Sequence, residues 1–194
     1  MNKGNYRPVS VLTTLSKVFE KILAGQITPF LDSVLSPHLS AFRKGYSCQD
    51  ALLHLLETWR KELLGRKKVG AVLMDLSKAF DCMPHQLLVA KMDAYGVDKQ
   101  SCDIVMSYLT ERQQRVRVGS HYSTWKTTIK GVPQGSVLGP TFFNVFLNDL
   151  FYFIKIATLT NYADDNTLHF AHQNFQNVKT YLQKVQRRLY GCLP

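Results

Sequence analysis

Apolar residues in the early part of the chain recur at the spacing of helices that bury one face. The first such helix is expected over residues 12–23, with an inward stripe of Leu12, Leu15, Val18, Phe19, Ile22 and Leu23. A second is expected from Ser47, where Ser47 and Asp50 match a capping box, to Gly65. Its inward stripe comprises Leu52, Leu55, Leu56, Trp59 and Leu63. Further helices are expected over residues 84–95, 101–109, 140–150 and 175–189.

Three stretches have the pattern of strands. Residues 69–76 form a short apolar run that suits a buried strand and carries Asp75 to its end. Residues 115–127 alternate around a Gly-Ser turn and predict a hairpin. Residues 157–162 and 166–170 read as two strands around a tight Ala-Asp-Asp turn. Together these elements predict an α+β fold, an antiparallel sheet covered by helices on one face.

The charge balance suggests the class of partner. The chain has 194 residues, and 24 Lys and Arg against 14 Asp and Glu give a formal net charge of +10. Such an excess favours polyanions, with nucleic acid first and an acidic membrane surface second. Composition alone is equally compatible with a basic domain that has no polyanionic partner.

Other classes are excluded by local patterns. The most apolar stretch, residues 142–154, is interrupted by polar residues and is too short to span a bilayer. The first eight residues contain no apolar segment typical of a secretory signal, so none is expected there. The four cysteines have neither zinc-site spacing nor a disulfide framework, so reduced thiols are expected. We therefore expect no membrane partner and an intracellular location, nucleus or cytoplasm.

Three acidic residues are candidates for chemistry. Asp75 ends the apolar strand, and Asp164 and Asp165 occupy the tip of the last hairpin. If those strands adjoin, three carboxylates converge, and like charges at close range require a cation. Oxygen ligands suit Mg²⁺ or Mn²⁺ rather than Zn²⁺, and two such ions about 4 Å apart would support phosphoryl transfer. Taken singly, each acid is better explained as a turn or capping residue, and only the three together favour a catalytic site.

Five blocks of sequence resemble the reverse transcriptase family. Residues 73–81, 131–140 and 162–165 are similar to its motifs A, B and C, in the family's order and at similar separations. Residues 5–10 and 41–45 are similar to its fingers motifs, with Ala41 where the family usually has Gly. The amino-acid sequences of these blocks are most similar to those of non-LTR (LINE-type) retrotransposon enzymes, and the resemblance covers nearly the whole chain.

The resemblance implies the fingers and palm of a right-hand polymerase. Residues 1–68 would be fingers-like, and residues 69–194 mainly palm with part of the fingers inserted. Such an enzyme extends a DNA primer on an RNA template with deoxynucleoside triphosphates; its protein partners stay unknown. A thumb, a primer grip, a motif D lysine and an endonuclease are not recognisable, so a catalytic-core fragment is expected. Lys179 and Lys184 are read as the solvated face of the last helix instead.

The resemblance also assigns roles to residues. Asp75 and Asp164 would bind the metal ions, Asp165 would complete the acidic site, and Leu76 would contribute its backbone carbonyl to the metal site. Phe80 would close the sugar pocket against a 2′-hydroxyl, although a core aromatic is the alternative. The remaining nucleotide-binding candidates are Gln134 and Gly135 in the motif B loop, Arg7 at the triphosphate, and Arg43. Arg43 could equally touch template or pair with Asp50 or a neighbour.

Two other functions stay open at this level. One is an RNA-templated RNA polymerase, because Asp81 follows the first aspartate closely and could contact a ribose hydroxyl. The other is a catalytically silent, basic nucleic-acid-binding remnant. Phe80 and the Tyr-Ala-Asp-Asp block favour DNA synthesis over the first, and the intact acids oppose the second.

Overall fold

The computed structural model describes residues 9–76, 78–155 and 157–192. The chain divides into two compact units, each built from two separate segments. Met1–Val34 and Lys78–Phe146 form the first, here called the helical unit, and Leu35–Ser77 and Leu147–Pro194 form the second, the sheet unit. This boundary does not coincide with the division of the chain near residue 68, and the assignment of fingers and palm stays a prediction.

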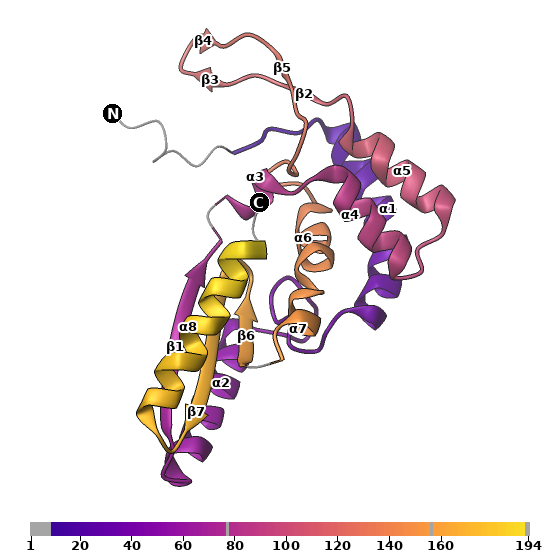
Figure 1. The fold of residues 1–194 in the computed structure, drawn as a ribbon. Coiled ribbons are helices and arrows are strands. Elements are labelled where there is room, and N and C mark those ends of the chain that lie inside the picture. The colour runs from indigo at the N-terminus through magenta and orange to yellow at the C-terminus, as the bar shows by residue number, and fades with distance from the viewer. Residues whose placement is uncertain (1–8, 77, 156, 193–194) are drawn as a thin grey trace. The chain divides into compact units, whose positions relative to one another are not determined.

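The sheet unit contains three antiparallel strands in the order β1-β7-β6 (Figure 1). They are β1 (Lys68–Asp75), β6 (Thr158–Tyr162) and β7 (Asp165–His172). β6 and β7 form the predicted hairpin, and β7 pairs with β1 along its whole length. The antiparallel sheet expected from the sequence is thereby confirmed, with β7 in the centre.

Helices cover both faces of this sheet, so the expectation of one covered face is wrong. α8 (Phe175–Cys192) packs over the face of Gly70, where a Cβ would lie 2.5 Å from Val178 Cγ1. On the same face, Phe170 stacks on Tyr181 with ring centroids 4.4 Å apart. α2 (Cys48–Leu64) lies on the opposite face, where Trp59 meets His169 edge-on. Neighbouring residues of β7 point to opposite faces, and both faces at this end carry bulky side chains that need cover.

The helical unit is built around α6 (Gly139–Leu147), whose Phe142 and Phe143 are fully buried. Around it lie α1 (Thr14–Val34), α3 (Ala79–Cys82), α4 (His85–Ala94) and α5 (Lys99–Leu109). The hairpin after α5 comprises β2 (Gln113–Gln114), β3 (Arg117–Val118), β4 (His121–Tyr122) and β5 (Lys126–Thr127). The predicted helix over residues 140–150 is divided, since a second short helix, α7 (Leu150–Phe153), follows in the sheet unit.

The buried stripes of the first two helices differ from those expected. In α1 the buried residues are Glu20, Leu23, Ile27 and Leu31, whereas Leu15, Val18, Phe19 and Ile22 are exposed. In α2 only Ala51 is fully buried, and Leu52, Leu56 and Leu63 are exposed. Both helices carry apolar residues on more than one face, and the position of the neighbouring elements decides which face is buried. The predicted cap of α2 is confirmed, because Asp50 N donates to Ser47 Oγ at 3.2 Å.

None of the helices in the described ranges is both long and apolar enough to cross a membrane.

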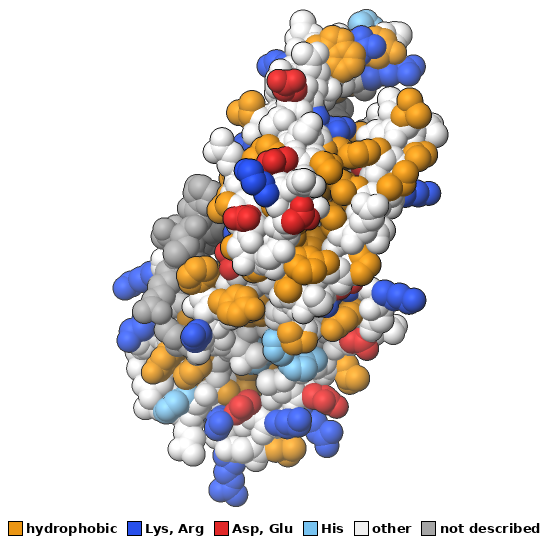
Figure 2. Space-filling view, turned by 90° about the vertical axis from the view of Figure 1, so that its right-hand side faces the viewer, with side chains coloured by type: hydrophobic (Ala, Val, Ile, Leu, Met, Phe, Trp, Pro, Cys, Tyr) orange, Lys and Arg blue, Asp and Glu red, His pale blue; other side chains and the backbone are white. Residues whose placement is uncertain are grey.

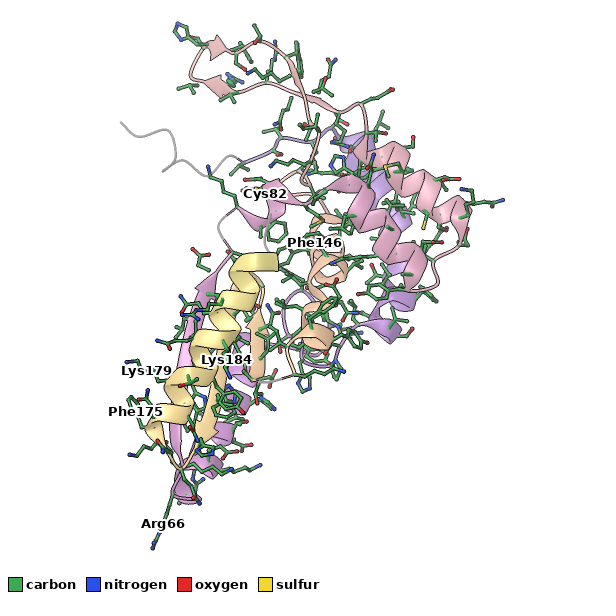
Figure 3. All side chains as sticks on the ribbon, in the orientation of Figure 1. Arg66, Cys82, Phe146, Phe175, Lys179 and Lys184 are labelled. Atoms are coloured by element: carbon green, nitrogen blue, oxygen red, sulfur yellow. The ribbon has the colours of Figure 1, made fainter. Side chains whose placement is uncertain are left out.

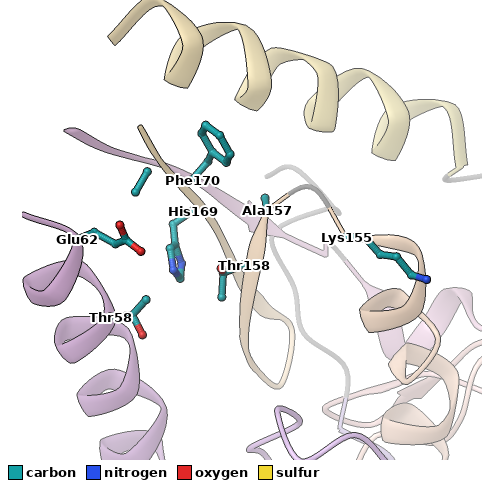
Figure 4. A pocket seen from close by; sticks show the side chains of 8 residues that line it. Thr58, Glu62, Lys155, Ala157, Thr158, His169 and Phe170 are labelled. Atoms are coloured by element: carbon teal, nitrogen blue, oxygen red, sulfur yellow. The ribbon is translucent and has the colours of Figure 1, made fainter. Parts of the chain in front are cut away.

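A pocket of about 260 Å³ lies between α2 and the sheet (Figure 4). His169 from β7 and Thr58 and Glu62 from α2 line it. His169 is only 2% exposed, and neither ring nitrogen has a hydrogen-bond partner among the described residues. Burial lowers the pKa of this imidazole, and the nearby His54 adds to the effect while Glu62 opposes it.

We expect His169 to make the protein less stable at acidic pH. In the unfolded chain a histidine has a pKa of about 6.5, above that of the folded His169. The unfolded state therefore binds more protons as the pH falls below about 6.5, and the free energy of unfolding decreases. Urea unfolding between pH 5 and pH 8 measures this slope. His169→Gln should flatten it and His121→Gln, an exposed control, should not; parallel curves for all three proteins would contradict the prediction.

Candidate active site

The end of the sheet where β1 stops and β7 starts brings two predicted acids together. Asp75 is the last residue of β1, Asp165 is the first of β7, and the two are directly paired in register. Residues paired in this way have Cβ atoms about 4.5–5.5 Å apart and point to the same face. Both acids are exposed, and Leu73 on the same face is 78% exposed. Within the sheet unit, the two carboxylates therefore lie on a part of the sheet that is open to solvent.

The third acid, Asp164, lies in the turn between β6 and β7. Its backbone carbonyl accepts hydrogen bonds from Leu76 N at 3.4 Å and from Asn166 Nδ2 at 3.0 Å. The first of these bonds attaches the turn to the residue that follows Asp75. The structure thus brings the three acids, and Leu76 with them, to one end of the sheet, as the sequence predicts.

Two buried asparagines support this turn. Ala163 has a φ of 54°, a left-handed conformation that costs a residue with a Cβ roughly 1 kcal/mol or more. Asn161 Nδ2 donates to Ala163 O at 2.7 Å and to Asn166 Oδ1 at 3.0 Å, and both asparagines are 1% exposed. They are paired across the two strands. Sequence reasoning missed both, although their symmetrical position around a tight turn was a usable signal.

The oxygen donors at this end of the sheet are of the types that bind a divalent metal ion. Carboxylate oxygens with a neighbouring backbone carbonyl are the donor types that Mg²⁺ and Mn²⁺ prefer, so the chemistry of the set fits. Among the described residues, however, no three His, Cys, Asp or Glu side chains are grouped so that they could hold an ion. The backbone thus places the acids at one site, while their side chains are not gathered into the expected close cluster.

The motif B loop, residues 130–139, is attached to the segment around α3 in the helical unit. Gly131 N donates to Met83 O at 2.7 Å, and Val132 N donates to Phe80 O at 2.9 Å. Gly131 has a φ of 81°, and a Cβ there would lie 2.6 Å from the carbonyl oxygen of Asp81. Only glycine fits this position, because the obstacle is backbone rather than a movable side chain.

The structure positions two predicted nucleotide-binding residues at this attachment. The ring of Phe80 is half-buried and stacks on Phe143, with centroids 4.3 Å apart and planes inclined by 13°. Gln134 Nε2 donates to both carboxylate oxygens of Asp81, at 3.0 and 3.1 Å. Gly135 follows, exposed and with a φ of 98°. The bond between Asp81 and Gln134 was not foreseen; it gives Asp81 a partner within the protein.

Glu20 is a second residue that sequence reasoning missed. It is fully buried in α1 and accepts hydrogen bonds from Val137 N at 2.6 Å, Tyr108 Oη at 2.8 Å and Ser16 Oγ at 3.2 Å. The pKa of Tyr108 is raised, first by burial and then by Glu20, so the phenol keeps the proton it donates. Glu20 therefore ties the end of the motif B loop to α1 and α5. The sequence did offer a signal for this buried acid, because Glu20 lies three positions before Leu23 and therefore on the same face of the helix.

Two arginines, Arg7 and Arg43, were predicted to bind the nucleotide. Arg7 lies outside the described residues. Arg43 Nη1 donates to Ser36 O at 2.8 Å and Leu39 O at 3.3 Å, and its guanidinium lies 4.7 Å from the ring centroid of Tyr46. Arg43 thus holds backbone carbonyls within the sheet unit, which corresponds to the structural alternative. Lys179 and Lys184 are exposed on α8, as expected (Figure 3).

Comparison with known proteins decides the family. A sequence model described as "Reverse transcriptase (RNA-dependent DNA polymerase)" matches residues 1–191. The chain belongs to the reverse transcriptase family. Among similar proteins of Drosophila melanogaster, a probable RNA-directed DNA polymerase from transposon BS is 34% identical over 179 residues, covering 84% of this chain and 19% of the relative. The RNA-directed DNA polymerase from mobile element jockey is 31% identical over 176 residues, with the same coverage of 84% and 19%.

Solved structures support the reverse transcriptase fold. Apo telomerase from Candida tropicalis, truncated from its C-terminal domain, superposes with a TM-score of 0.59 at 16% identity. The match covers 93% of this chain and 41% of that chain. The expected resemblance to non-LTR retrotransposon enzymes is confirmed by the two Drosophila relatives. This reverse transcriptase domain spans about a fifth of their length.

Proposed function

We propose that this chain is the catalytic core of an RNA-directed DNA polymerase that extends a DNA primer on an RNA template with deoxynucleoside triphosphates. The observation that carries the proposal is the pairing of Asp75 with Asp165, with Asp164 in the adjoining turn, at an open end of the sheet. The family match over nearly the whole chain supports it, and a net charge of +10 suits polyanionic substrates.

The proposed roles follow from the chemistry of nucleotidyl transfer. The primer 3′-hydroxyl attacks the α-phosphate in line, a P–O bond forms, and the bond to pyrophosphate breaks. Mg²⁺, or Mn²⁺, when bound would activate the attacking hydroxyl and stabilise the leaving oxygen. Asp75, Asp164 and Asp165 would hold it, with the carbonyl of Leu76 as a further oxygen donor. The exposure of Asp75 and Asp165 leaves room for the phosphates to approach.

The nucleotide would be selected by residues of the motif B region. We propose that Phe80 excludes a 2′-hydroxyl and that Gln134 and Gly135 contact the incoming nucleotide, Gln134 being held in place by Asp81. Arg7 and Arg43 are proposed to contact the triphosphate. Arg43 would have to give up its present bonds to do so. An intracellular setting, nuclear or cytoplasmic, fits the free thiols of Cys48, Cys82 and Cys102.

Primer extension tests the proposal. The purified chain is incubated with Mg²⁺ and a labelled DNA primer on an RNA template, with either deoxyribonucleotides or ribonucleotides. Extension with deoxyribonucleotides supports the proposal. Extension with ribonucleotides only would favour the RNA polymerase alternative, and binding without any extension would favour the silent remnant.

Replacing Phe80 by Ala is expected to raise ribonucleotide incorporation relative to deoxyribonucleotide. The ring is the proposed obstacle to the 2′-hydroxyl, and its removal relaxes a steric rejection. The same change removes the stack on Phe143 and costs roughly 2–3 kcal/mol, because the ring is half-buried. The readout is the ratio of the two incorporation rates, with Phe80→Tyr as the control that keeps the ring. An unchanged ratio in a folded, active Phe80→Ala protein would leave Phe80 a core aromatic only.

A further inference from the structure

The hairpin over residues 112–128 carries arginines stacked on aromatic rings. The guanidinium carbon of Arg115 lies 4.2 Å from the ring centroid of Tyr122 and 4.7 Å from that of Trp125. Arg117 lies 5.5 Å from the same tyrosine ring. Tyr122 is 51% exposed and Trp125 is 57% exposed. Both rings thus contact arginine and still expose about half of their surface to a further partner.

The hairpin holds its shape through its own backbone. Arg117 pairs with Tyr122 and Gln114 with Lys126 in antiparallel register. Ser123 N donates to Val116 O, and Val116 N donates back to Ser123 Oγ, both at 2.9 Å. Every side chain of residues 113–127 is exposed, and Figure 1 shows the hairpin extending beyond α5 within the helical unit. These aromatic residues are thus not explained by packing.

The charged residues of the hairpin and of the segment that follows it are all basic. Residues 112–148 include no Asp or Glu, and the five basic residues among them are Arg112, Arg115, Arg117, Lys126 and Lys130. In Figure 2, Lys and Arg side chains gather with hydrophobic ones at the top of the molecule. A positive surface interleaved with open aromatic rings matches the composition of sites that bind single-stranded nucleic acid.

We propose that this hairpin is a binding site for single-stranded nucleic acid. Bases stack on the open faces of Tyr122 and Trp125, and Arg115 and Arg117 donate to phosphates. A guanidinium lying flat on a ring keeps its in-plane N–H groups available for phosphate oxygens, so one arginine serves both contacts. The inference deepens the proposed function, since it assigns the unpaired part of a template or product strand to a surface without the catalytic acids.

Equilibrium binding tests the site without catalysis. Fluorescence anisotropy of labelled oligouridylate and oligodeoxythymidylate of about 15 nucleotides covers a site of this size and separates RNA from DNA. Trp125→Ala should weaken binding about tenfold, the usual loss for one stacked base. Replacing Arg115 and Arg117 by Ala should also lower the slope of log affinity against log salt by about 0.7 for each phosphate contact.

Matched controls lie in the sheet unit. Arg60→Ala removes the same charge from an exposed helix position, and Tyr152→Ala removes an aromatic ring that is 60% exposed. Both should bind like the parent protein. The chain has two tryptophans, so quenching of fluorescence by the oligonucleotide that disappears in Trp125→Ala reports the stack directly. Equal affinities for hairpin and control variants, in proteins with unchanged circular dichroism, would overturn the inference.

The outcome of the binding test on the hairpin is independent of the outcome of the primer-extension test on the proposed function. A parent chain that binds through Trp125 but never extends a primer would contradict the polymerase proposal and support the hairpin site. A chain that extends primers, but whose hairpin variants bind oligonucleotides like the parent, would support the polymerase proposal and contradict the hairpin site.

Discussion

Replacing Asp164 by Asn is expected to lower the rate of primer extension about a thousandfold or more while the protein stays folded. The carboxylate is the proposed ligand of the metal ions that stabilise charge in the transition state, and loss of such electrostatic stabilisation has effects of this size. Asp75→Asn should behave in the same way. The backbone carbonyl of Asp164, which carries the bonds from Leu76 and Asn166, is untouched by the change, so the turn should persist.

Asp165→Asn should separate activity from stability. Asp75 and Asp165 are paired across two strands, and like charges in that position destabilise a sheet by roughly 0.2–1 kcal/mol. The amide removes this repulsion, so the free energy of unfolding should rise by about that amount as activity falls. Asp103→Asn, on the exposed face of α5, is the control that should change neither. Undiminished extension by the Asp164 or Asp75 variant would refute the active site proposed here.

Replacing Glu20 by Ala is expected to destabilise the protein by roughly 3 kcal/mol. The change leaves Val137 N–H and the Tyr108 hydroxyl without their acceptor in a buried place, and each unpaired group costs about 1–3 kcal/mol. Urea unfolding measures the loss. Because the pKa of Tyr108 is raised, the phenol stays a donor across the working pH range, and the loss should not depend on pH through this group.

Two further variants test the cause of that loss. Glu20→Gln keeps the length of the side chain and one acceptor oxygen, so it should cost less than Ala. Tyr108→Phe removes one donor, and in a double-mutant cycle with Glu20→Ala the two changes should not be additive, because they share a hydrogen bond. Additive effects would mean that the bond between Tyr108 and Glu20 contributes nothing and that the other contacts of Glu20, among them the bond from Val137 N, explain its loss.

Several parts of the fold could be read from local patterns. The Ser47–Asp50 cap, the strand ending at Asp75 and the hairpin that carries Asp164 and Asp165 each depend on residues close together in the chain, and each is present. The buried stripes of α1 and α2 could not be read in this way. Their apolar residues cover more than one helix face, and only the elements packed against them select the buried one.

The candidate site shows the same contrast. The order of the three motifs placed Asp75, Asp164 and Asp165 in one site, and antiparallel pairing of β1 with β7 was enough to bring their backbones together. The sequence could not show that, among the described residues, no three acidic side chains lie close enough together to hold an ion. Nor could it show that Asp81 holds Gln134, since 53 positions separate the two residues.

What the sequence by itself determined about this protein is its family, most of its helices and strands and the identity of its acids, because these depend on composition and short-range spacing. Tertiary structure alone decided why Gly131 must be glycine, since the obstacle is the backbone of Asp81, and why a charged Glu20 is buried, since its three donors include Tyr108 and Val137. It also left the aromatic rings of the hairpin exposed beside arginines. These features depend on which distant segments meet, and local propensity carries no information about that.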